Sequence, residues 1–286
     1  MEYKDRIKKP EWLRVNLGNN DNFSTTGRIV KKHLLHTICE SGRCPNLGEC
    51  WNRKTATFMI AGDICTRSCK FCNTKTGKPL PLDSDEPCKI AESVQLLGLK
   101  HAVITSVDRD DLPDSGASHW AKTIEEIKKK NPGVTIETLI PDFRGNKNHL
   151  DLIIQTRPEI ISHNIETVRR LTPLVRSVAK YEMSLDVLKH ISESDIPAKS
   201  GLMLGLGETK EEVVQTMKDL FETGCRLLSI GQYLQPSKKN IPVAEYIRPE
   251  IFEEYKRSAQ FLQFEYVESG PLVRSSYHSN NFIINK

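Results

Sequence analysis

The sequence lacks several features that would place it in other classes of protein. None of its apolar runs approaches the roughly 18 residues of a membrane-spanning helix. Its first residues carry acidic side chains and lack the apolar stretch of a secretory signal. Internal repeats and low-complexity tracts are also missing. These absences predict a globular protein of the cytoplasm with no membrane partner.

An excess of charge of one sign is missing as well. The 286 residues include 41 basic and 37 acidic side chains, so the formal net charge is only +4. No stretch concentrates the excess basic charge into a surface that would bind nucleic acid. We therefore expect no nucleic-acid partner.

Short apolar runs alternate with helical patterns from residue 57 onward. This alternation is typical of an α/β protein with βα units and a parallel sheet. A capping box at Thr209 and Glu212 is expected to start one of the helices. Six units over about 200 residues fit either a doubly wound sheet or an incomplete barrel, and the pattern alone does not choose between them. The expected strands are 57–62, 101–106, 134–139, 159–163, 198–204 and 226–233, with a further short strand at 266–268.

Cysteine is sparse over most of the chain but dense in one stretch. The chain has 8 cysteines, and because disulfides are rare in the cytoplasm we expect thiols or metal ligands. Two of them, Cys88 and Cys225, have no spaced partners and are expected to be structural. The others form two groups of three, in loop sequence with Gly, Pro and Arg where buried structural cysteines are not expected: Cys39-x4-Cys44-x5-Cys50 and Cys65-x3-Cys69-x2-Cys72.

Zinc and iron–sulfur clusters are the two metal groups that such cysteines bind. Structural zinc sites usually join two short cysteine pairs that are separated by a dozen or more residues. Here each group places three ligands on one continuous loop, which favours an iron–sulfur cluster. The second group follows the first expected strand, so it is expected at the carboxyl edge of the sheet. Three thiolates would leave one iron of a [4Fe–4S] cluster open for chemistry.

The segment from Cys65 to Cys72 resembles the C-x3-C-x-aromatic-C motif of the radical S-adenosylmethionine (SAM) superfamily, with Phe71 as its aromatic residue. The resemblance implies a partial (β/α)6 barrel of the radical SAM type with N- and C-terminal extensions. It also implies a cluster whose open iron binds the amino and carboxylate groups of SAM, and whose electron cleaves SAM to a 5′-deoxyadenosyl radical. On this pattern the expected SAM contacts are Phe71, Thr105, Ser106, Glu137, Asn164, Lys199 and Met203, although several could instead be ordinary strand-end or core residues.

The first cysteine group resembles the auxiliary-cluster motif of the lipoyl synthase family. The likeness extends over nearly the whole chain and closes with Arg-Ser-Ser-Tyr-His at 274–278. It implies a second [4Fe–4S] cluster, whose fourth ligand is a serine of that last segment. We assign Ser276 to this role, with Ser275 as the alternative. The implied ligands of the auxiliary cluster are Cys39, Cys44, Cys50 and Ser276, and those of the radical SAM cluster are Cys65, Cys69 and Cys72.

The resemblance implies a sulfurtransferase that inserts two sulfur atoms into an octanoyl chain, at C6 before C8. These C–H bonds are too strong for general-base chemistry, so a carbon radical must abstract hydrogen. Two SAM molecules would be consumed, and the auxiliary cluster would donate the sulfur. The octanoyl group would be an amide on a lysine of a lipoyl carrier domain, in a 2-oxoacid dehydrogenase E2 or the glycine cleavage H protein. Ferredoxin or flavodoxin would supply electrons.

Three parts of the chain are expected. They are an N-terminal extension with the auxiliary motif (1–56), the barrel (57–265) and a C-terminal extension with the Arg-Ser-Ser-Tyr motif (266–286). The alternatives in function are a biotin-synthase-like enzyme or a methylthiotransferase, a non-catalytic iron–sulfur electron carrier, and a zinc-stabilised binding module.

Two further residue patterns carry weaker expectations. Gly205-Leu206-Gly207-Glu208 follows a strand and precedes a helix, so it either lets the backbone approach SAM or makes a tight turn. His163 is expected to be a satisfied hydrogen-bonding residue rather than a catalytic one. No catalytic residue beyond the cluster ligands is assigned.

Overall fold

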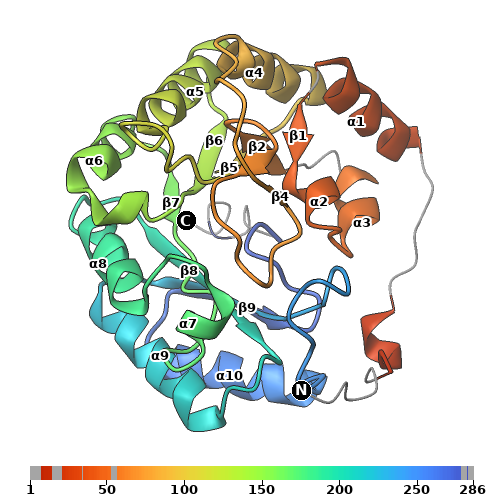
Figure 1. Cartoon of the computed structure of the whole chain (residues 1–286), viewed down its shortest axis with the longest axis vertical. Helices are drawn as coiled ribbons and strands as arrows, with labels where there is room; N and C mark the ends of the chain where they lie inside the picture. The colour runs from red at the N-terminus through yellow and green to blue at the C-terminus, as the bar shows by residue number, and fades with distance from the viewer. Residues whose placement is uncertain (1–7, 15–20, 34, 53–56, 278–281, 283–286) are drawn as a thin grey trace.

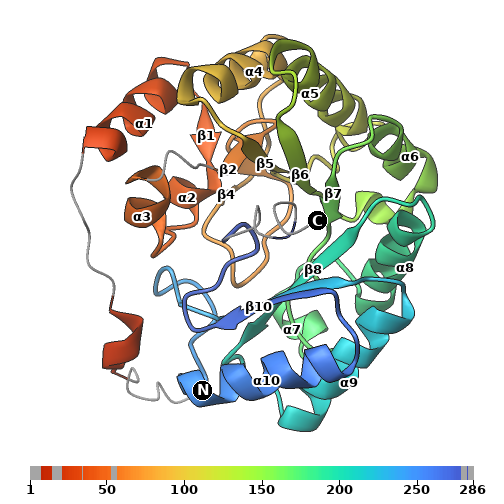
Figure 2. The same ribbon diagram turned by 180° about the vertical axis from the view of Figure 1, so that it is seen from behind.

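The computed structural model describes residues 8–14, 21–33, 35–52, 57–277 and 282. One eight-stranded sheet curves into an open ring, and the main helices lie outside it (Figures 1 and 2). Seven neighbouring strands are parallel, and β1 pairs with the edge of β2 in the antiparallel direction. In sheet order the strands are β1 His36–Thr37, β2 Thr57–Ile60, β5 His101–Ser106, β6 Thr135–Leu139, β7 Ile160–Ser162, β8 Ala198–Leu204, β9 Leu227–Gln232 and β10 Tyr266–Gly270.

The strand order decides between the two expected architectures. From β2 to β9 the parallel strands follow one another in chain order, whereas a doubly wound sheet reverses direction at a switch point. A helix after each strand covers the outer face of the sheet (Figure 2). The partial (β/α)6 barrel is therefore confirmed, with β10 as an additional parallel strand.

Six helices form the outer layer of the barrel, and shorter elements lie at its edges. No helix in the described part of the chain is both long and apolar enough to cross a membrane. The outer helices are α4 Glu86–Leu97, α5 Ala117–Lys130, α6 Lys147–Gln155, α8 Tyr181–Ser192, α9 Lys210–Glu222 and α10 Pro249–Phe261. The others are α1 Asp21–Lys32, α2 Ile38–Ser41, α3 Leu47–Asn52, α7 Thr172–Val175, the 3-10 helices η1 Glu11–Leu13 and η2 Phe143–Gly145, and a small sheet of β3 Ile64–Cys65 and β4 Lys75–Thr76.

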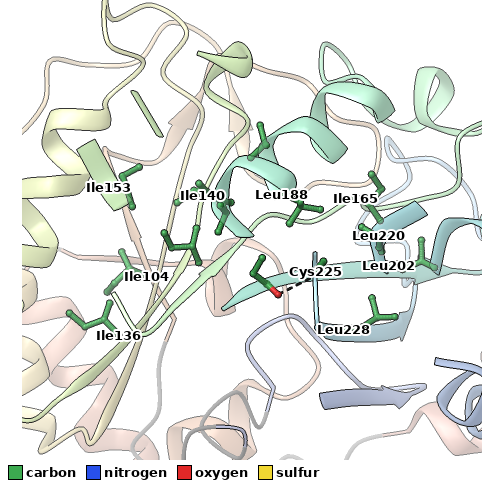
Figure 3. Close-up of a cluster of buried hydrophobic side chains, with 14 of the residues drawn as sticks. Ile104, Ile136, Ile140, Ile153, Ile165, Leu188, Leu202, Leu220, Cys225 and Leu228 are labelled. Atoms are coloured by element: carbon green, nitrogen blue, oxygen red, sulfur yellow. Dashed lines mark hydrogen bonds between the residues drawn. The ribbon is translucent and has the colours of Figure 1, made fainter. Parts of the chain in front are cut away.

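Local sequence signals account for several helix ends. The capping box of α9 is confirmed, because Thr209 Oγ1 accepts from the Glu212 amide (3.3 Å) and the Glu212 carboxylate accepts from the Thr209 amide (2.8 Å). Helix α4 ends at Gly98, whose φ of 64° is left-handed and favours glycine. The apolar faces of these helices pack against the strands, as Leu188 and Leu220 do in Figure 3.

The two expectations for isolated cysteines have different outcomes. Cys225 is fully buried, and its thiol donates to the Ala198 carbonyl (3.5 Å; Figure 3), so its structural role is confirmed. Cys88 is exposed on α4, so the expectation that it is structural is wrong. The buried face of α4 includes Ile90 and Val94, and Cys88 lies off that face.

Both edges of the sheet differ from the expected pattern. The strand expected at 266–268 runs to Gly270 and pairs with β9, so the first residues of the expected C-terminal extension belong to the barrel sheet. At the other edge, β1 has only two residues, which is too short for a periodic sequence signal. The division of the chain into three parts stays a prediction.

His163 follows β7 and is buried between the sheet and the outer helix α8. Its Nδ1 donates to the Ile140 carbonyl (3.0 Å), and its Nε2 accepts from the Ser184 hydroxyl (2.9 Å). Ser184 in turn accepts from the Arg176 guanidinium (2.7 Å). Burial and the nearby Arg176 cation lower the pKa of His163 to about 4. The expected hydrogen-bonding role of this residue is confirmed.

Acid should destabilise the fold through His163. In the unfolded chain His163 takes up a proton near pH 6.5, whereas in the folded chain it does so only near pH 4. The contribution of neutral, buried His163 to stability is therefore complete above pH 6.5 and is lost as the pH falls from 6.5 to about 4. The loss should be on the order of 3 kcal/mol. We expect His163→Gln, which cannot titrate, to lose less stability than the parent between about pH 7 and pH 4.5 in urea unfolding. Equal losses in the two proteins would contradict this.

Candidate functional site

The second cysteine group lies in the loop that follows β2, at the carboxyl ends of the barrel strands. Cys65 belongs to β3, and a hydrogen bond from the Cys72 amide to the Cys69 carbonyl (3.1 Å) closes a turn between the other two. All three are half-buried free thiols. The structure therefore places this group on the strand-end loop that the sequence predicts.

Main-chain amides point at two of these sulfur atoms. The Arg67 and Asp108 amides donate to Cys65 Sγ (3.4 and 3.3 Å), and the Thr74 amide donates to Cys72 Sγ (3.5 Å). Such hydrogen bonds to sulfur are a recognised feature of protein-bound iron–sulfur clusters. Burial, with the Asp108 carboxylate, raises the pKa of the Cys65 thiol to about 12. Iron would offset this, because metal coordination deprotonates a thiol.

The spacing of these side chains suits a cluster better than a single ion. Among the described residues, no three His, Cys, Asp or Glu side chains converge as the ligands of one metal ion do. A [4Fe–4S] cluster binds each thiolate on a different iron, so its ligands need not converge on one point. The donor set of free thiols, with amides directed at the sulfur, fits a [4Fe–4S] cluster.

The first cysteine group lies beside β1, in the opening between the two edge strands of the sheet. Cys39 is buried in α2, Cys50 lies in α3, and the Cys44 amide donates to the Cys39 carbonyl (3.0 Å) between them. Burial raises the pKa of the Cys39 thiol to about 12, and the other two thiols add to the rise. Three soft donors grouped this closely also fit an iron–sulfur cluster.

The two cysteine loops contact each other directly. Asn73, which follows Cys72, donates through its side chain to the Ser41 carbonyl beside Cys39 (2.8 Å). Arg43 donates to the Pro236 carbonyl (3.0 Å), in the loop that follows β9. The first cysteine group is thereby tied to the carboxyl edge of the barrel.

The segment 271–277 reaches the first cysteine group from the other end of the chain. Asn46 Nδ2 donates to the Leu272 carbonyl (2.7 Å), and the Tyr277 hydroxyl lies 3.3 Å from the Glu49 carboxylate. Burial lowers the pKa of Arg274, and the nearby Cys44 opposes this shift. In Figures 1 and 2 the chain after β10 turns into the interior of the ring. The segment 271–277 therefore contacts residues of the first cysteine group's segment directly.

The same segment is bound to the inner wall of the barrel at Ser275. The Ser275 hydroxyl accepts from Asn164 Nδ2 (2.8 Å), and its carbonyl accepts from Lys199 Nζ (2.7 Å). Lys199 also pairs with Glu137, which is fully buried (2.9 Å). A Cβ at Gly201 would lie 2.6 Å from Asn164 Oδ1 and 3.0 Å from the Ser275 hydroxyl, so glycine there leaves room for both side chains.

The structure divides the expected SAM contacts into two sets. Thr105, Ser106, Asn164 and Met203 lie at or just beyond the carboxyl ends of their strands, while Phe71 packs half-buried against the core from the cysteine loop.

Glu137 and Lys199 lie deeper in the barrel and bond to each other. Asn164 Oδ1 is buried and has no hydrogen-bond partner in the described part of the chain. A ligand that donates a hydrogen bond would satisfy this oxygen, so Asn164 combines a strand-end position with a free acceptor.

Gly205-Leu206-Gly207-Glu208 forms a tight turn. The Glu208 carboxylate accepts from the amides of Gly205 (2.5 Å) and Leu206 (2.9 Å). A Cβ at Gly205, whose φ is 93°, would lie 2.1 Å from the Gln232 side chain. Of the two expectations for this pattern, these contacts support the turn.

Arg67 is the residue at this site whose part sequence reasoning missed. It lies between Cys65 and Cys69, is only 5% exposed, and binds the carboxylates of Asp110 and Asp142. A hydrogen bond from Arg67 lowers the pKa of Asp110. Burial raises the pKa of Asp142, but the hydrogen bond and charge of Arg67 outweigh it and lower that pKa to about 2. The sequence did contain a signal for this ion pair. Asp110 and Asp142 each follow an expected strand, and Arg67 is the one cation between Cys65 and Cys69.

Sequence comparisons identify the family. The model of the Radical SAM superfamily matches residues 59–220. Lipoyl synthase from Bacteroides fragilis is 63% identical over 97% of this chain and 96% of its own length. The chain belongs to the lipoyl synthase family. Lipoyl synthase from Treponema denticola is 57% identical, over 97% of this chain and 96% of its own.

Family membership decides between the alternatives that the sequence left open. The chain is a radical SAM enzyme of a family defined by sulfur insertion, and the superfamily carries a [4Fe–4S] cluster and uses SAM. Membership of this enzyme family argues against two of the alternatives, a zinc-stabilised binding module and a non-catalytic electron carrier. The lipoyl synthase name implies a lipoyl carrier protein as the substrate.

Solved structures agree on the fold. Methylornithine synthase PylB has a TM-score of 0.57 at 11% identity, and the match covers 85% of this chain and 74% of PylB. SuiB from Streptococcus suis bound to S-adenosylmethionine has a TM-score of 0.55 at 9% identity, over 76% of this chain and about half of SuiB, 51%. At such low identity these likenesses show the barrel fold alone.

The contact between Asn46 and Leu272 should stabilise the segment 271–277. In Asn46→Ala the half-buried Leu272 carbonyl loses this partner, which should cost about 1 kcal/mol of unfolding free energy. Amide hydrogen exchange should become faster at 271–277. Asn131→Ala is the matched control, since Asn131 is also buried and donates to a carbonyl, that of Ala91 (2.9 Å) on the outer layer. Unchanged exchange at 271–277 in Asn46→Ala would contradict the prediction.

Proposed function

We propose that this chain inserts sulfur at C6 and then C8 of an octanoyl group carried on a lysine of a lipoyl carrier domain. The main support is the direct contact between two segments that each carry three cysteines outside any disulfide, at the carboxyl edge of one barrel. The loops join where Asn73 binds the Ser41 carbonyl. A reaction that needs a radical generator close to a sulfur donor requires this proximity.

Each cysteine group has a separate role in this proposal. The second group would hold the radical SAM cluster, and the first group with Ser276 would hold an auxiliary [4Fe–4S] cluster. When bound, the two clusters would supply the electron that cleaves SAM and the sulfide that enters the product. A serine oxygen is a weaker ligand of iron than a thiolate, so Ser276 could be released while the cysteines stay bound. The ligands are Cys39, Cys44, Cys50 and Ser276 in one site, and Cys65, Cys69 and Cys72 in the other.

The chain's own residues would bind SAM and exclude water. Thr105, Asn164 and Met203 lie at the strand ends, where they can contact SAM, and Phe71 lies half-buried in the cysteine loop. Ser106 is assigned to SAM as well, but its hydroxyl accepts from Trp120 Nε1 of the outer helix α5 (3.1 Å), which turns it away from the barrel interior. Glu137 and Lys199 are assigned to SAM as well, but their contacts with each other and with Ser275 support a second task, which is to hold the segment 271–277 inside the barrel. A wall closed by this segment would shield a carbon radical from solvent.

The partners follow from the same assignment. The carrier would be the lipoyl domain of a 2-oxoacid dehydrogenase E2 or the glycine cleavage H protein, and ferredoxin or flavodoxin would supply electrons. The expected location in the cytoplasm remains part of this proposal.

Cysteine substitutions should separate the two roles. The anaerobically reconstituted chain should hold about eight iron atoms, and with SAM, dithionite and an octanoyl-lysine peptide it should form 5′-deoxyadenosine and a dithiol product. Cys69→Ala should lose about half of the iron and all SAM cleavage. Cys44→Ala should cleave SAM but transfer no sulfur. Cys88→Ala, at an exposed cysteine outside both groups, should behave as the parent does. Sulfur transfer by Cys44→Ala would refute the assignment of the donor.

Ser276 and Ser275 should differ in the same assay. Ser276→Ala should retain SAM cleavage and lose most sulfur insertion, because the auxiliary cluster loses its oxygen ligand. Ser275→Ala removes the hydroxyl that accepts from Asn164 and should retain sulfur insertion. Product analysis by mass spectrometry, with Mössbauer spectra of both variants, would compare them. Full product formation by Ser276→Ala would remove that residue from the ligand set.

A further inference from the structure

Arg67 makes two bidentate ion pairs next to the radical-cluster loop. Its Nε and one terminal nitrogen donate to both Asp110 oxygens (2.7 and 2.9 Å), and its two terminal nitrogens donate to both Asp142 oxygens (2.9 and 2.7 Å). A third carboxylate, that of Asp108, lies 3.3 Å from Nε. The planar guanidinium can make both fork contacts at once, and a lysine ammonium cannot.

These contacts connect three loops at the carboxyl edge. Asp110 follows β5 and Asp142 follows β6, while the main chain of Arg67 belongs to the cysteine loop. Its amide donates to Cys65 Sγ, and its carbonyl accepts from the Thr76 hydroxyl (3.2 Å). The position of the Cys65 sulfur is therefore linked through one residue to the ends of two barrel strands.

Cluster binding alone does not require this arrangement. Three thiolates suffice to hold a cluster with one open iron, and burying a cation with several carboxylates carries a desolvation cost. SAM, however, must contact the open iron and the barrel strands at the same time. The distance between the cysteine loop and the strand ends then determines whether both contacts can form.

We propose that Arg67 is a positioning residue that fixes the radical-cluster loop over the ends of β5 and β6, so that SAM can bind the open iron and the barrel together. The inference rests on the proposed assignment of Cys65, Cys69 and Cys72 as cluster ligands. It predicts a loss in SAM affinity rather than a loss of the cluster. A misplacement of about 1 Å can slow an enzymatic reaction about a hundredfold. We expect a loosened loop to weaken SAM binding at least tenfold.

Arg67→Lys tests this, because it keeps the charge and removes the fork. In the reconstituted holoenzyme we expect the parent's iron content and an unchanged reduction potential without SAM, since the charge beside Cys65 is the same. The change in the electron paramagnetic resonance (EPR) spectrum of the reduced cluster on adding SAM should need at least tenfold more SAM. The KM for SAM in 5′-deoxyadenosine formation should rise similarly, with a smaller change in kcat.

Arg109→Lys is the matched control. Arg109 is also buried, at 2% exposed, and lies in the loop after β5 that holds Asp110. It forms a bidentate pair with Asp111 in that loop (2.9 and 2.9 Å). Its third contact is with the Ala61 carbonyl (3.1 Å), which precedes the cysteines. It should leave the SAM titration close to that of the parent. An equal shift in both variants, or none in Arg67→Lys, would overturn the inference.

A second variant keeps the test decisive if Arg67→Lys fails to hold its cluster. Asp142→Asn weakens one fork and leaves the Asp110 pair intact, and it should shift the same EPR titration. If it binds SAM as the parent does, the inference is wrong. The double variant Arg67→Lys, Asp142→Asn should shift the titration by less than the two single variants together, because the two residues share one of the ion pairs. If the SAM-dependent change in the EPR spectrum persists in Cys69→Ala, the proposed cluster ligands are refuted instead.

Discussion

The barrel sheet does not close, and both ends of the chain are arranged around this opening. β1 and β10 are the edge strands, one provided by residues ahead of the barrel and the other by residues after its last long helix. The first cysteine group lies on the β1 side, and the segment 271–277 comes from the β10 side. The site proposed for a second cluster thus draws on two parts of the chain that a closed barrel would keep apart.

Buried polar contacts then determine how this assembly is held. Glu137 and Lys199 pair inside the barrel and Lys199 donates to the Ser275 carbonyl, while Arg67 binds two carboxylates at the carboxyl edge. Charges inside a protein are costly unless their partners are well placed, so each such group strongly favours one arrangement of the loops it joins. Radical chemistry benefits from this, because a reactive intermediate must meet one partner and no other.

The outer face of the same sheet is apolar. Side chains of the strands and the outer helices, such as Ile136, Leu202 and Leu228, form a continuous core behind the site (Figure 3). Rigid packing behind the strands gives the loops at their carboxyl ends a fixed base. The variable task of holding clusters and substrate is left to loops and extensions, as is usual in barrels of this type.

The sequence by itself determined the chemistry of the ligands and most of the barrel. Cysteine spacing is a local property, since each group lies within one short segment of the chain, and the apolar runs of the strands from β2 to β9 are long enough to be recognised in the sequence. The cap at Thr209 was equally local.

Only the tertiary structure decided that the strands form a barrel rather than a doubly wound sheet. It also showed that β1 covers an edge and that Ser275 binds Asn164 and Lys199. Arg67 had a signal in the sequence, but its two carboxylates are 43 and 75 residues away. Contacts at such separations depend on the order of the strands, and no local propensity encodes that order.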